Sequence, residues 1–116
     1  MAKNETFLAP LARTTSAALV SETKDSSGYR EFVLCIPVSA KSGTTPTLDL
    51  KIQDSVDAVK WFDLFEVPQI TAVGNYAYRI AVPFMPKLRA VYTIAGTTPV
   101  FTFECFAHLK TREAIV

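Results

Sequence analysis

The sequence predicts an all-β protein, an antiparallel β-sandwich of about 7–8 strands with an extended N-terminal arm. Short segments alternate apolar and polar side chains with a period of two, as strands with one wet face do. Turn-forming clusters separate these segments at intervals of about 8–12 residues, which is typical of sandwiches. No stretch combines helical periodicity with caps at both ends. The 116 residues, 49% of them hydrophobic, suffice for one core.

The N-terminal part is predicted to hold an arm and one short strand. Residues 1–14 are of mixed character and contain Pro10, so we expect an extended arm that is not a core element. A single sandwich domain then spans residues 15–116. Within it, residues 17–21 form a short strand candidate, and the polar residues 24–28 indicate a turn.

The remaining strands follow from alternation and from the turn residues between them. They are expected at residues 29–39, 47–54, 59–65, 76–82, 87–94 and 100–109, joined by turns or loops at 40–46, 55–59, 71–75, 83–86 and 95–99. Because proline cannot donate to a ladder, Pro37 indicates a sheet edge or a bulge. The apolar faces are predicted to carry Phe32, Leu34, Ile36, Val38, Leu48, Leu50, Ile52, Tyr76, Tyr78, Ile80, Val82, Leu88, Ala90, Tyr92, Ile94, Phe101, Phe103 and Cys105.

The two cysteines are expected to be reduced and not bonded to each other. If Leu34 points to the core, a period of two turns Cys35 outward, whereas Cys105 shares the inward face of Phe103. The two thiols then lie on opposite sides of their strands. Their spacing also matches no zinc or redox motif.

Charge and composition argue against several classes of protein. The net charge is only +1 and no basic run occurs, which speaks against a nucleic-acid partner. No segment approaches the roughly 18 apolar residues of a membrane-spanning helix. The N-terminus lacks the apolar run of a signal peptide. We therefore expect a soluble chain, made in a cytosol, with no nucleic-acid and no membrane partner.

An internal repeat is the most distinctive feature of the sequence. Gly-Thr-Thr-Pro occurs at residues 43–46 and again at 96–99, each time between two alternating segments. Glycine supplies a positive φ and proline fixes φ before the next strand. The structural interpretation is two similar β-hairpins in a pseudo-symmetric pair of sheets, with local turn chemistry explaining the motif. The functional interpretation is that both loops form one recognition rim.

Catalytic and metal sites are not indicated. His108 is the single histidine and has no partner motif, so it is better explained as a surface or rim residue. Clustered acids could act as a carboxylate pair or bind Ca²⁺, but solvated turn acids that help to terminate strands explain them better, and the spacing is not that of an EF-hand. We expect no enzymatic activity, no catalytic residues, no metal and no cofactor. The acids considered are Asp49, Asp54, Asp57, Asp63 and Glu66.

Aromatic residues leave a further function open. Trp61, Tyr76, Tyr78 and Tyr92 could stack on a glycan, which would make the chain a carbohydrate-binding module. Packing in the core or at a subunit interface explains the same residues more simply in an all-β domain of this size.

Two stretches resemble the small β-sandwich proteins that tailed bacteriophages encode among their structural genes. The first is residues 38–57, including Gly-Thr-Thr-Pro and the run Thr-Leu-Asp-Leu-Lys-Ile-Gln-Asp-Ser, followed by Trp61-Phe62-Asp63. The second is residues 88–103, with the second Gly-Thr-Thr-Pro. The resemblance covers roughly residues 30–106. It leaves out residues 1–14, and Pro83-Phe84-Met85-Pro86 replaces the usual polar or Gly-rich approach to the following strand.

The resemblance implies a virion structural protein, and most directly a capsid decoration (cement) protein on the outer surface of the head. Its partners would be the major capsid protein and further copies of itself, as a symmetric dimer or trimer. A head–tail or tail-associated component of the same fold is the alternative. Apolar residues outside the alternating faces suggest subunit or capsid contacts. They occur around Trp61 and at the candidate interface residues Phe7, Leu8, Pro10, Leu11, Phe84 and Met85.

Overall fold

The structure is a computed structural model that describes residues 2–14, 19–20, 24–26 and 28–110. Its strands belong to one antiparallel sheet, and no helix occurs among the residues described. The all-β antiparallel class predicted from the sequence is therefore confirmed. The strands are β1 (Ala2–Arg13), β2 (Leu19–Val20), β3 (Lys24–Asp25), β4 (Glu31–Ser55), β5 (Phe62–Glu66), β6 (Gly74–Ile80) and β7 (Lys87–Lys110).

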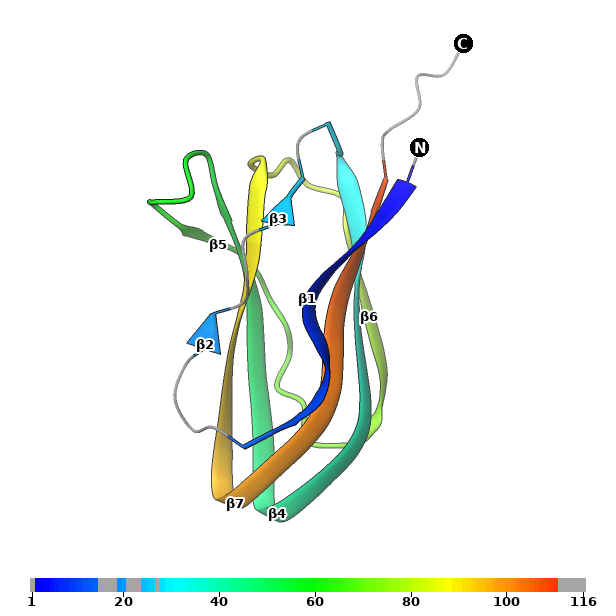
Figure 1. The fold of residues 1–116 in the computed structure, drawn as a ribbon, viewed down its shortest axis with the longest axis vertical. Coiled ribbons are helices and arrows are strands. Elements are labelled where there is room, and N and C mark those ends of the chain that lie inside the picture. Colours follow the sequence, from blue (N-terminus) through cyan, green and yellow to red (C-terminus); the bar gives the residue numbers. More distant parts are fainter. Residues whose placement is uncertain (1, 15–18, 21–23, 27, 111–116) are drawn as a thin grey trace.

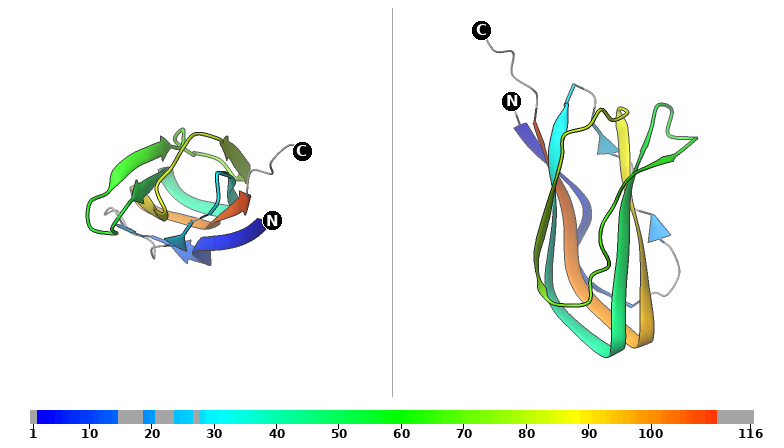
Figure 2. Two further views of the ribbon diagram at one scale, coloured as in Figure 1. Left: turned by 90° about the horizontal axis from the view of Figure 1, so that it is seen from above. Right: turned by 180° about the vertical axis from the view of Figure 1, so that it is seen from behind.

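Two long strands, β4 and β7, organise the sheet by bending at the same end of the molecule (Figure 1). Residues 31–42 of β4 pair with residues 100–110 of β7, and residues 47–55 pair with residues 87–95. The sheet thus turns back on itself, and its two halves face each other (Figure 2). The first half-sheet also contains β1 and β6, and the second also contains β2, β3 and β5.

The core lies between the half-sheets, because the inward faces of β4 and β7 carry the alternating apolar side chains. Two ring contacts join the halves. Tyr92 meets Phe103 edge to face, with centroids 5.6 Å apart, and Phe65 meets Tyr78 at 5.4 Å. The predicted inward positions on β4 and β7 are buried. Of the residues predicted on the apolar face of 76–82, Ile80 is buried, Tyr76 and Tyr78 are half-buried, and Val82 is exposed.

The N-terminal segment differs from the expected arm. Residues 2–13 are extended, but they pair with β7 as a strand of the same sheet. Register shifts between Thr6 and Leu8 and between Leu8 and Leu11 break the alternation. The neighbouring side chains Phe7 and Leu8 are consequently both buried in the core, at 5% and 7% exposure. The prediction that this segment is not a core element was wrong, because a bulged strand carries no period-two pattern.

The two expected hairpins are also not formed. The segments on either side of each Gly-Thr-Thr-Pro lie in opposite half-sheets, and each pairs with the other long strand. Thr44 of the first motif pairs with Thr97 of the second, so each motif is a bend inside a continuing ladder. Sequence alone suggested hairpins because turn residues between two strands usually join neighbours. The expected pair of sheets is not shown, because the strands belong to one sheet. The pairing is nevertheless similar for the two repeats, since β1 pairs with β7 after the second motif and β5 pairs with β4 after the first.

Smaller differences concern the ends of the sheet. Residues 24–28 were expected to be a turn, but Lys24 and Asp25 pair with β7 as strand β3. The short strand expected at 17–21 is present at Leu19 and Val20, and its other residues lie outside the described part of the chain. Pro37 lies between β6 and β7 in an interior strand, next to the irregularity between Val38 and Ala40, so the alternative of a sheet edge was wrong.

Candidate functional site

The paired bends form one exposed end of the molecule. Gly43 and Gly96 have φ of +105° and +128°, and Thr45 and Thr98 have φ of +46° and +44°. Each of these threonines donates its hydroxyl to the carbonyl oxygen of the preceding threonine at 2.8 Å. Their side chains are exposed, so the two motifs do share one rim, as the functional interpretation of the repeat requires.

Close backbone packing explains why both motifs begin with glycine. A Cβ added to Gly43 would lie 2.5 Å from the carbonyl oxygen of Thr98. A Cβ added to Gly96 would lie 2.9 Å from the carbonyl oxygen of Thr45. Each glycine therefore rests against the backbone of the other motif, and local turn chemistry alone does not account for the repeat.

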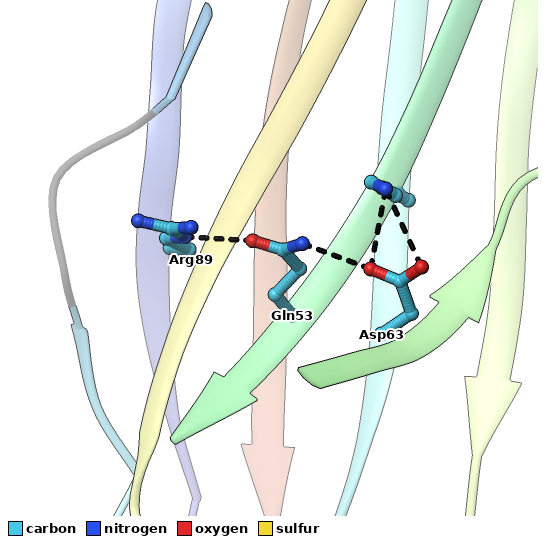
Figure 3. Close-up of polar contacts among 4 residues, drawn as sticks. Gln53, Asp63 and Arg89 are labelled. Carbon is cyan, nitrogen blue, oxygen red and sulfur yellow. Dashed lines mark hydrogen bonds and ion pairs between the residues drawn. The ribbon is translucent and has the colours of Figure 1, made fainter. Parts of the chain in front are cut away.

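A row of polar side chains crosses the outer face of the second half-sheet (Figure 3). Arg89 on β7 donates Nε–H to Oε1 of Gln53 on β4 at 2.8 Å. Gln53 in turn donates Nε2–H to Oδ1 of Asp63 on β5 at 2.8 Å. Lys51 lies 3.2 Å from the same carboxylate. The hydrogen bond from Gln53, followed by the contact with Lys51, holds the pKa of Asp63 below its usual value.

Trp61 extends this row at the start of β5. The guanidinium carbon of Arg89 lies 4.2 Å from the centre of the Trp61 ring, which is a cation–π contact. Positions 51, 53 and 89 face outward because their neighbours in the alternation face the core. The contact between Arg89 and Trp61 could not be predicted from the sequence, since tertiary pairing places both β7 and β5 beside β4.

A groove of about 290 Å³ lies beside this row on the same half-sheet. Val91 and Thr93 of β7 and the charged side chains of Asp49, Lys51 and Glu66 line it, together with Leu50 and Val67. Gln69 donates its side-chain amide to Asp49 at 3.1 Å. The groove thus combines apolar surface with carboxylates and one ammonium group.

The acids considered from the sequence do not come together in one site. Asp54 is buried and accepts the backbone N–H of Met85 at 3.1 Å. Asp57 accepts the N–H groups of Lys60 and Val59, which lower its pKa in that order. Within the part of the chain that the structure describes, no group of three or more His, Cys, Asp or Glu side chains could hold a metal ion.

The four aromatic residues considered for glycan stacking are likewise separated. Tyr92 is buried in the core, and Arg89 lies over Trp61. Tyr78 contacts Phe65, and Tyr76 donates its hydroxyl to the carbonyl of Ala72 at 2.8 Å. They form no single exposed platform.

His108 lies in the ladder between β7 and β1. Its Nδ1 is 2.6 Å from Oδ1 of Asn4, so the ring contacts a neutral amide of the adjacent strand. This placement matches the expected surface position.

The candidate interface residues fall into three groups. Phe7 and Leu8 belong to the chain's own core, so they are not available as an exposed interface in this structure. Phe84 is half-buried, with its ring centroid 5.3 Å from that of Phe32, and Met85 is half-buried beside it. Two residues are exposed, Pro10 and Leu11.

Sequence reasoning did not single out three large apolar side chains that are more than half exposed. Val56, Val59 and Phe62 are 67%, 75% and 55% exposed and lie on or next to the connection between β4 and β5. This connection projects from the body of the sheet (Figure 1). The excess of apolar residues around Trp61 pointed to the region. Two valines inside a turn that also carries Ser and Asp were the available sign of exposed apolar side chains, because turns usually lie at the surface.

Both cysteines are free, as expected. Cys105 is fully buried, and burial raises the pKa of its thiol. Cys35 is half-buried, and its thiol pKa is raised by desolvation and secondarily by the charge of Glu104. Neither thiol has the lowered pKa of a reactive cysteine.

Comparison of the chain with protein-family models, with curated proteins and with solved structures finds no match. Among the described residues there is also no helix long and apolar enough to cross a membrane.

Proposed function

We propose that the chain is a decoration (cement) protein of a tailed-phage capsid, without enzymatic activity, that binds the major capsid protein on the outside of the head as a symmetric homo-oligomer. In this proposal the two facing half-sheets serve as a rigid β-sandwich. The resemblance of residues 38–57 and 88–103 to phage structural proteins supports the proposal. These two stretches contain both bends, and they pair with each other in the sheet.

The observation that carries the proposal is the distribution of exposed apolar side chains. Large apolar residues that are more than half exposed are concentrated on connections and near sheet edges. A shell protein buries such residues against its neighbours, where many equivalent contacts add up to tight binding. These residues are Leu11, Val56, Val59, Phe62, Val73 and Val82.

The test is binding to empty capsids assembled from the major capsid protein of the same genome. We expect the chain to sediment with these capsids to saturation, and a reconstruction to show its density on the outer lattice. Val59→Asp should weaken binding more than Ala77→Asp, which adds the same charge at an exposed residue of β6, away from the connection between β4 and β5. A chain that stays in the supernatant at every concentration contradicts the proposal.

Two alternatives predict different results. A head–tail or tail-associated component would give density at the portal vertex or the tail of complete particles rather than on the capsid lattice. A carbohydrate-binding module is favoured by one observation, the groove of mixed polarity on the half-sheet that carries Trp61. It predicts specific binding on a glycan array that Trp61→Ala abolishes.

A further inference from the structure

The connection between β4 and β5, residues 55–62, presents apolar side chains on an ordered backbone; we call it the projecting loop. Ser55 Oγ accepts the N–H groups of Asp57 and Ala58 at 3.2 and 2.9 Å. Asp57 Oδ1 accepts the N–H groups of Val59 and Lys60 at 2.9 and 3.0 Å. Because these bonds fix the loop in advance, little conformational entropy is lost when a partner covers Val59.

The groove of about 290 Å³ on the second half-sheet has the complementary character. Val91 and Thr93, both half-buried, offer apolar contact, while Asp49 and Glu66 are exposed carboxylates. With Lys51 as its one cation, the side chains that line the groove carry a formal charge of −1.

The projecting loop offers the opposite charge next to its most exposed apolar side chain. Lys60 follows Val59 directly, and both are exposed. The carboxylate of Asp57 is turned back onto the loop's own N–H groups, so the loop presents an ammonium group rather than an acid to a partner. A valine side chain followed by a lysine matches a groove that combines apolar contacts with two carboxylates.

A second copy of the chain can supply this loop. Phe62, at the loop's end, pairs with Asp54, whereas Glu66, at the groove, pairs with Lys51. These two points are about 13 Å apart along β5, at roughly 3.3 Å per residue. The groove therefore lies near the end of β5 that is away from the chain's own projecting loop.

We propose that copies of this chain associate head to tail, with Val59 and Lys60 of one copy seated in the groove formed by Asp49, Glu66, Val91 and Thr93 of the next. Such a contact uses two different surfaces, and it gives a ring where the rotation between copies closes. The proposal rests on the homo-oligomer of the proposed function and names the surfaces that form it.

Sedimentation velocity over a range of concentrations tests the contact in the full chain. We expect the wild type to associate, and both Val59→Asp and Thr93→Arg to weaken association by about tenfold or more, since each removes apolar contact or fills the groove. Val82→Asp is the matched control, because it makes the same change at an exposed valine outside both surfaces of this contact. It should leave self-association unchanged, whatever its effect on the capsid binding that the proposed function assigns to the exposed apolar residues. Circular dichroism confirms that each variant is folded.

Mixing the two defective variants distinguishes this contact from a symmetric one. Val59→Asp retains an intact groove and Thr93→Arg an intact loop, so an equimolar mixture should form heterodimers and stop there. In the same way, Lys60→Glu should weaken association and Glu66→Lys should restore it in the double variant. A monomeric wild type at about 100 μM, equal effects of Val59→Asp and Val82→Asp, or a monomeric mixture would each overturn the proposal.

Capsid binding, measured separately, keeps the two proposals apart. Head-to-tail oligomers that do not bind capsids would support this contact and contradict the capsid function. Monomers that bind capsids would contradict this contact and the homo-oligomer, and would support only the capsid-binding part of the proposed function.

Discussion

Replacing Gly43 by alanine tests whether the reciprocal packing of the two bends holds the folded sheet together. The new methyl group would meet three backbone atoms of the second motif, at 2.5 Å from Thr98 O, 2.8 Å from Thr97 O and 2.9 Å from the Cα of Pro99. Backbone cannot swing aside as a flexible side chain can. The variant must therefore separate the two bends or distort the ladder that continues on either side of them.

The expected cost has two parts. An L-residue at a φ of +105° carries backbone strain of about 1–3 kcal/mol. Forcing a methyl group into close-packed backbone adds about 1–3 kcal/mol. The sum, about 2–6 kcal/mol, is a large share of the 5–15 kcal/mol that typically stabilises a domain. Gly28→Ala measures the backbone strain alone, because φ of Gly28 is +84° and a Cβ there would meet nothing within 4 Å. The difference between Gly43→Ala and Gly28→Ala then gives the cost of the packing clash.

Urea denaturation of the wild type and of the variants at Gly43, Gly96 and Gly28 provides the measurement. Gly43→Ala and Gly96→Ala should each lower the free energy of unfolding more than Gly28→Ala does. The double variant Gly43→Ala/Gly96→Ala should cost less than the sum of the single changes, because the first change already separates the bends. Equal losses for Gly43→Ala and Gly28→Ala would refute the packing argument and leave only backbone strain.

Three further outcomes follow from the structure. Leu8→Ala should lower the free energy of unfolding by about 2–4 kcal/mol and Leu11→Ala by less than about 0.5, since only the first side chain is buried; equal effects would show that β1 is not docked. In a Cys35→Ser variant, a thiol reagent should label Cys105 only after unfolding, and rapid labelling of the native protein would contradict its burial. The lowered pKa of Asp57 adds stability above the unfolded-state value of about 3.9, and this is lost as pH falls through the folded-state value. The stability difference between wild type and Asp57→Asn should therefore shrink between pH 7 and pH 3, and a difference independent of pH would contradict the assignment.

The alternating segments could be predicted from the sequence because burial on one face of a strand is a local property. A period of two already places Leu34, Leu50, Tyr92 and Phe103 in the core and turns Cys35 away from Cys105. The all-β class and the unpaired cysteines follow from the same pattern, whereas the internal repeat was indicated by the two Gly-Thr-Thr-Pro motifs.

The candidate surfaces could be predicted only in part. The excess of apolar residues around Trp61 indicated the region of the projecting loop, but the groove and the contact between Arg89 and Trp61 join strands that are distant in the sequence. Phe7 and Leu8 were expected at an interface, but both are buried in the core. A bulge that buries two neighbouring side chains interrupts the period-two alternation, so the sequence pattern did not reveal their burial.

The inward side chains of the long strands β4 and β7 and the doubled Gly-Thr-Thr-Pro motif could be predicted from the sequence alone. How the two repeated segments combine depends on tertiary pairing. Turn residues specify a change of direction but not the partner of the strand that follows, since pairing depends on contacts between distant segments. Gly43 and Gly96 show both effects. Their positive φ is a local requirement of each bend, whereas their close approach to the other motif exists only once β4 and β7 have paired.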